Sequence, residues 1–220
     1  MQVDSFSKII FVHIPRTGGS WFGYSWRSNY DGRGDYNLRQ GNLVNNKNKK
    51  QTPIGRHGTI KGIKQKFQTI DADITGYKFI TLVREPIDRV LSAWSWFSEV
   101  NQTAKRQKWK TIDHMLDAHE KGIGKTEMYP QTYWLKEDDA KFDHIFRFED
   151  LLKGHDVIRK YFPDFPKRGK PVHFRNDTRK SWLKRQGRHD GYKKYLDKKQ
   201  IDRIKELYKE DIDYLAKYYD

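Results

Sequence analysis

The fold is decided near the N-terminus, where residues 8–21 read KIIFVHIPRTGGSW. The apolar run Lys8–Ile14 is typical of a short strand that is buried on both faces of a sheet. Pro15–Ser20 predicts a turn, and a helix is expected to follow it as far as about Ser28. A strand that leads through a glycine turn into a helix can surround an anion with backbone N–H groups.

A second stretch repeats this pattern: residues 77–94 read YKFITLVREPIDRVLSAW. Residues 77–83 predict another buried strand, and Pro86 suits the first turn of the helix that follows. In sheets of this kind, ligands bind at the carboxyl ends of the strands. The two turns after these strands are therefore the places to look for a site.

The rest of the chain adds helices and one more strand. We expect a strand over 143–148 and a helix over about 149–162, while 29–53 are polar and predict a loop with at most one short strand. Further helices are expected at 59–67, at about 112–119 and from about 198 onward. Alternating strands and helices predict a single α/β domain over residues 1–220, with a central parallel sheet flanked by helices.

The composition excludes some chemistry and favours anion binding. The chain has 220 residues, no cysteine and a net charge of +15, so it has no thiol nucleophile and no cysteine-ligated metal. Residues 167–199 hold 13 basic and 3 acidic residues, and residues 47–66 hold 7 basic residues and no acid. These segments suit an anionic partner, although a solvated charged surface is the alternative. No apolar run is long enough for a membrane span, and we expect a soluble, cytoplasmic protein.

The first turn carries several groups that bind phosphate or sulfate. Gly18 and Gly19 let the backbone approach an anion closely, Thr17 and Ser20 add hydroxyl donors, and Arg16 adds a cationic fork. The turn is P-loop-like, but the nucleotide-triphosphate motif G-x-x-x-x-G-K-[ST] is absent. An ordinary glycine-rich turn is the alternative interpretation.

The second turn places Arg84 at a strand end and Ser92 eight residues later, on the following helix. A guanidinium at such a position can hold a phosphate through two hydrogen bonds. A structural salt bridge between Arg84 and Glu85 or another acid is the alternative. Asp88 and Arg89 can form a surface ion pair.

Together the two turns resemble the sulfotransferases that use 3′-phosphoadenosine-5′-phosphosulfate (PAPS), and especially the carbohydrate sulfotransferases related to heparan sulfate 2-O- and 6-O-sulfotransferases. Residues 13–20, HIPRTGGS, resemble their 5′-phosphosulfate loop, and residues 84–92, REPIDRVLS, resemble their 3′-phosphate motif. Residues 142–151, FDHIFRFEDL, and the ending at 173–219 are also similar to that family.

The resemblance implies a site that binds PAPS and releases adenosine 3′,5′-bisphosphate. The residues that it implies in cofactor binding are Arg16, Thr17, Gly18, Gly19, Ser20, Trp21, Arg84, Ser92, Lys184 and Arg185. The last two lie in a late basic loop, where a solvated charged face is the alternative. The family usually has lysine where this chain has Arg16, and arginine keeps the positive charge but does not readily lend a proton.

His57 is the candidate general base. It lies between two glycines in residues 54–60, IGRHGTI, and a neutral imidazole with a reference pKa near ~6.5 suits the removal of a hydroxyl proton. Related carbohydrate sulfotransferases carry a catalytic histidine at this place, so the resemblance implies that role for His57, together with Arg16 as the second catalytic residue. A surface histidine in a basic loop is the alternative.

We therefore expect a sulfotransferase that moves a sulfuryl group from PAPS to a hydroxyl, with a saccharide as the favoured acceptor and no metal. In-line displacement at sulfur with stabilisation of the developing charge would be the mechanism. A nucleotide-dependent kinase of related fold is the enzyme alternative. A basic nucleic-acid-binding module is the other, although it leaves the glycine turn and the pair Arg84 and Ser92 unexplained.

Overall fold

The computed structural model describes residues 2–5, 7–19, 22, 36–39, 42–53, 55, 57–100, 109–137, 141–151, 156–163 and 195–219. The chain divides into two compact units. One comprises residues 1–83 and 133–172, and the other comprises residues 84–132 and 173–220. Among the described residues, no helix has the length and apolar character that crossing a membrane requires.

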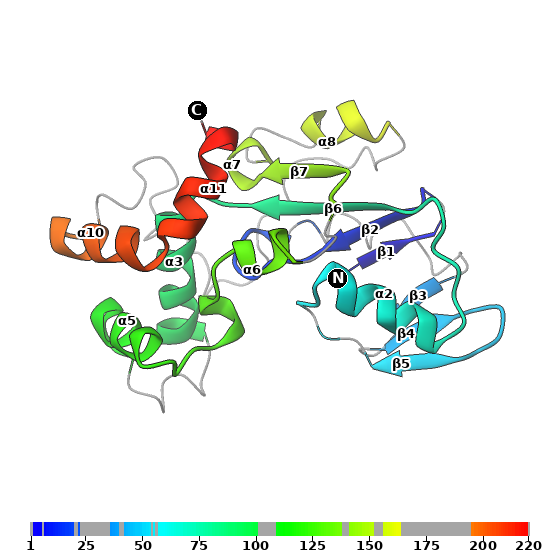
Figure 1. Cartoon of the computed structure of the whole chain (residues 1–220), viewed down its shortest axis with the longest axis horizontal. Helices are drawn as coiled ribbons and strands as arrows, with labels where there is room; N and C mark the ends of the chain where they lie inside the picture. Colours follow the sequence, from blue (N-terminus) through cyan, green and yellow to red (C-terminus); the bar gives the residue numbers. More distant parts are fainter. Residues whose placement is uncertain are drawn as a thin grey trace. The chain divides into compact units, whose positions relative to one another are not determined.

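The first unit is built on a four-stranded sheet with the order β1-β2-β6-β7 (Figure 1). Its strands are β1 (Gln2–Asp4), β2 (Ile9–Val12), β6 (Lys78–Val83) and β7 (His144–Arg147). β2, β6 and β7 pair in parallel, which confirms the predicted α/β class, whereas β1 pairs antiparallel with β2. The sheet is therefore mixed, because the short connection after β1 folds that strand back as a hairpin partner.

The parallel strands are buried as their apolar sequences predict. All four residues of β2 and the last five of β6 are buried. Flanking helices are α2 (Ile60–Thr69), α7 (Phe148–Leu151) and α8 (Asp156–Tyr161). The helix expected at 59–67 is confirmed, whereas the one expected at 149–162 is two short helices, with residues 152–155 outside the described part.

The polar segment before α2 forms strands where a loop was expected. β3 (Tyr36–Arg39), β4 (Asn42–Asn45) and β5 (Gln51–Pro53) make an antiparallel sheet. The prediction failed because polar residues serve as interior residues here. Asn45 is buried, and its side-chain amide donates to the carbonyl of Ile70, 3.1 Å away. A buried polar group with a partner is compatible with a strand.

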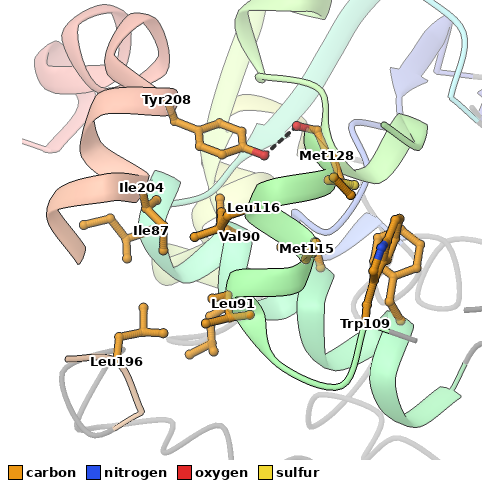
Figure 2. Close-up of a cluster of buried hydrophobic side chains, with 14 residues drawn as sticks. Ile87, Val90, Leu91, Trp109, Met115, Leu116, Met128, Leu196, Ile204 and Tyr208 are labelled. Carbon is orange, nitrogen blue, oxygen red and sulfur yellow. Dashed lines mark hydrogen bonds between the residues drawn. The ribbon is translucent and has the colours of Figure 1, made fainter. Parts of the chain in front are cut away.

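The second unit is helical. Its elements are α3 (Pro86–Ser95), η1 (Trp96–Val100), α5 (Ile112–Glu120), η2 (Thr126–Met128), α10 (Lys198–Leu207) and α11 (Lys209–Tyr219). The helix α6 (Thr132–Leu135) has its first residue in this unit and the others in the first unit. α3 starts at Pro86 as predicted, and the side chain of Glu85 caps it by accepting from the N–H of Asp88. Apolar side chains of α3, α5 and α10 form the core of this unit (Figure 2).

The helix expected from Lys198 to the C-terminus is interrupted at Tyr208, between α10 and α11. The Tyr208 side chain is buried, and its hydroxyl donates to the carbonyl of Met128 across 2.7 Å (Figure 2). A continuous apolar stripe in the sequence does not reveal such a break, because both helices contribute to that stripe.

Arg89 and Asp88 do not form the expected surface ion pair. Arg89 is only 1% exposed, and its guanidinium donates to the carbonyls of Glu127 and Tyr129, at 3.3 and 2.8 Å. Burial lowers the pKa of Arg89, and the nearby Asp211 carboxylate opposes that shift. Arg89 is thus an internal cation with an internal acidic partner.

Replacing Arg89 tests how much this buried cation contributes to the stability of the fold. We expect Arg89→Met to lower the free energy of unfolding by about 3–5 kcal/mol, because Asp211 would lose its buried cationic partner. Urea denaturation of the variant and the wild type measures this. Lys198→Met, at a side chain that is 89% exposed, is the control and should change stability by less than about 0.5 kcal/mol. A loss below about 1 kcal/mol for Arg89→Met would contradict the assignment.

Candidate active site

The turn after β2 has an unusual backbone. Arg16 has a φ of 68° and Gly18 a φ of 94°, so two of three successive residues are left-handed. The Thr17 hydroxyl donates to the carbonyl of Ile14 at 2.9 Å, and the N–H of Phe22 donates to the carbonyl of Gly18 at 3.1 Å. The first bond closes the turn, and the second is a helical bond that begins directly after it. Backbone strain of this kind concentrates at ligand-binding turns.

Both glycines of the turn are required by their neighbours. A Cβ on Gly18 would lie 2.5 Å from the Phe148 ring, and a Cβ on Gly19 would overlap the imidazole of His13. The backbone of this turn therefore packs directly on two rings. A side chain at either position would force the turn or the facing ring to shift.

His57 lies against the same turn. Its Nδ1 is 2.9 Å from the carbonyl oxygen of His13, and the two imidazole rings are 4.6 Å apart. Because a carbonyl oxygen only accepts, Nδ1 must carry a hydrogen. In the neutral ring Nε2 then holds the lone pair, so Nε2 is the nitrogen that could accept a proton.

A second segment of the first unit holds the main chain around His57. The indole Nε1 of Trp134 donates to the carbonyl of His57 at 3.0 Å. Glu137 accepts from the Thr59 hydroxyl at 2.5 Å and from the N–H of Lys61 at 2.9 Å. Sequence reasoning missed Trp134 and Glu137, because they lie more than 70 residues from their partners and belong to no motif.

In the second motif, Arg84 is oriented by Asp88, an acid of the same motif. Arg84 is 6% exposed, and its Nε and Nη2 lie 2.7 and 2.6 Å from the same oxygen of Asp88. The salt bridge weighed for Arg84 therefore exists, with Asp88 as the acid and Glu85 as the helix cap. Asp88 fixes one edge of the guanidinium. Ser92 is 1% exposed on α3, two turns further along.

Not every predicted site residue can be placed. Ser20, Trp21, Lys184 and Arg185 lie outside the described residues, as does the expected helix beyond Phe22. Within the described ranges, no three histidine, aspartate or glutamate side chains gather where they could hold a metal ion.

The packing of the first turn leads to a paired prediction. We expect Gly19→Ala to lower the free energy of unfolding by about 1–3 kcal/mol, because the new methyl would collide with His13. Gly55→Ala is the matched control, since nothing lies within 4 Å of its added Cβ. Urea denaturation compares the two, and equal stability for both variants would show that the turn does not pack as described.

Comparison with known proteins gives one result. No curated protein matches this chain. A protein-family model described as "Sulfotransferase family" matches residues 1–219. The match covers nearly the whole chain, including both turns and the segment that holds His57. The chain therefore belongs to the sulfotransferase family.

Proposed function

We propose that residues 1–220 act as one sulfotransferase domain that moves a sulfuryl group from PAPS to a hydroxyl of a saccharide, with His57 as general base. The observation that carries this proposal is the hydrogen bond between His57 Nδ1 and the carbonyl of His13. It brings an imidazole whose Nε2 could accept a proton to a glycine turn suited to anions. Membership of the sulfotransferase family supports the reaction class.

The first turn has the chemistry to hold the 5′-phosphosulfate of PAPS. The helical bond after Gly18 marks a helix start, and the N–H groups of a helix start favour negative charge. By its place in the turn, Arg16 belongs to the set of residues proposed to bind the phosphosulfate. Thr17 is fully buried and its hydroxyl donates to Ile14, so its place in this set rests on the family resemblance. We keep Ser20 and Trp21 in the same set as predictions.

The second motif would hold the 3′-phosphate. Asp88 engages one edge of the Arg84 guanidinium, and an arginine held at one edge is oriented without losing its charge. Ser92 would add a hydroxyl. Lys184 and Arg185 remain predicted contacts of the adenosine end.

PAPS would supply an activated sulfuryl group with adenosine 3′,5′-bisphosphate as its leaving group. His57 Nε2 would take the proton of the acceptor hydroxyl as that oxygen bonds to sulfur. Arg16 and the N–H groups of the turn would stabilise the charge that grows on the leaving oxygen as its bond to sulfur breaks. Trp134 and Glu137 would keep the main chain around His57 in place during this step.

The role of His57 is tested by its pH profile. We expect His57→Ala to lower kcat by about two to four decades, the usual scale of general acid–base catalysis, with nearly unchanged affinity for adenosine 3′,5′-bisphosphate. Wild-type activity should rise with pH through a histidine titration that the variant lacks. His114→Ala, at an exposed histidine of α5, is the control. Near-normal turnover of His57→Ala would assign the base to another residue.

The phosphate site is tested by calorimetry with two nucleotides. The wild type should bind adenosine 3′,5′-bisphosphate much more tightly than 5′-AMP, and Arg84→Ala should weaken the bisphosphate by about 1.5–3 kcal/mol. Arg159→Ala, which removes an arginine paired with an aspartate on α8, controls for the loss of charge. Equal affinity of the wild type for both nucleotides would remove the case for a 3′-phosphate site.

A further inference from the structure

The main chain of Arg84 is paired with a side chain. The N–H of Arg84 donates to Oε1 of Gln131 at 3.0 Å, and Nε2 of Gln131 donates to the carbonyl of Arg84 at 2.8 Å. One carboxamide thus satisfies both backbone groups of the residue that follows β6. Gln131 is fully buried, so water does not substitute for either bond.

Gln131 is itself held by a buried carboxylate. Asp211 of α11 is fully buried, and its two oxygens accept from the N–H of Gln131 at 2.7 Å and of Thr132 at 2.8 Å. A bond from a backbone N–H to a carboxylate is charge-assisted and stronger than a neutral one. Asp211 therefore fixes the point from which the Gln131 side chain reaches Arg84.

The residues just before Gln131 are fixed as well. Arg89 donates to the carbonyls of Glu127 and Tyr129, and Tyr208 donates to the carbonyl of Met128 between them. Five hydrogen bonds, from Arg89 of α3, from Tyr208 between α10 and α11, and from Asp211 of α11, thus hold residues 127–129, 131 and 132. Because these bonds hold the main chain before and after Gln131, they fix the position of its carboxamide.

We propose that Gln131 and Asp211 are positioning residues that set the main chain of Arg84 and thereby aim its guanidinium at the 3′-phosphate. This inference rests on the proposed function. Asp88 orients the far end of the Arg84 side chain, and Gln131 fixes its origin. A side chain fixed at both ends loses little further freedom when it binds, which favours affinity. The effect belongs to the 3′-phosphate alone, because 5′-AMP lacks that group.

Calorimetry on the full chain tests this with adenosine 3′,5′-bisphosphate and 5′-AMP. Gln131→Met removes both bonds to Arg84 without adding charge, and should weaken the bisphosphate about fivefold or more while 5′-AMP stays within about twofold. Gln68→Met, at an exposed glutamine of α2, is the matched control and should change neither. Circular dichroism melting verifies that each variant is folded.

Asp211→Asn is the second variant, in case Gln131→Met does not fold. By charge alone, removing a carboxylate should tighten the binding of an anion, whereas loss of the tether should weaken the bisphosphate selectively. Selective weakening in either folded variant supports the proposal. Unchanged bisphosphate affinity, equal weakening of both nucleotides, or tighter binding by Asp211→Asn overturns it. If the wild type itself does not prefer the bisphosphate, or Arg84→Ala binds it normally, the proposed function fails first.

Discussion

The parallel pairing of β2 with β6 is the constraint on which the rest of the structure depends. Val12, the last residue of β2, is in register with Thr81 of β6, so the two strands end at the same edge of the sheet. The chain leaves β2 into the turn with Gly18 and leaves β6 directly into Arg84. Both strands are buried, so hydrophobic packing fixes where these two polar segments begin.

Polar groups other than the predicted site residues do much of the positioning. The His13 carbonyl and Trp134 hold the two ends of the His57 residue, its ring nitrogen and its carbonyl. In the second unit Gln131 holds both backbone groups of Arg84, and Asp211 in turn holds the N–H of Gln131. In both cases a residue with proposed chemistry is held by hydrogen bonds, and the neighbours Trp134, Gln131 and Asp211 are buried. Such satisfied buried networks favour a single arrangement of the groups that they contain.

Local patterns predicted the fold well where packing follows the sequence. The buried strands, the helix start at Pro86 and the α/β class all come from apolar runs and end signals. The strands β3 to β5 were not predicted, because the burial of Asn45 depends on a hydrogen bond to Ile70, 25 residues away. A contact at that separation leaves no local sequence pattern. The same reason applies to the site. His57 was predicted as a site residue from its flanking glycines and the family resemblance, and that role remains a proposal. No local pattern pointed to Gln131, because its partner Arg84 lies 47 residues away.

Transfer of a sulfuryl group by this chain can be measured directly in one assay. The wild type is incubated with a panel of saccharides and PAPS radiolabelled in its sulfuryl group, and in parallel with ATP radiolabelled in its terminal phosphate. We expect label from PAPS to appear on a saccharide together with an equal amount of adenosine 3′,5′-bisphosphate, and no transfer from ATP. Transfer of phosphate from ATP, with no labelled sulfate reaching any acceptor, would contradict the account.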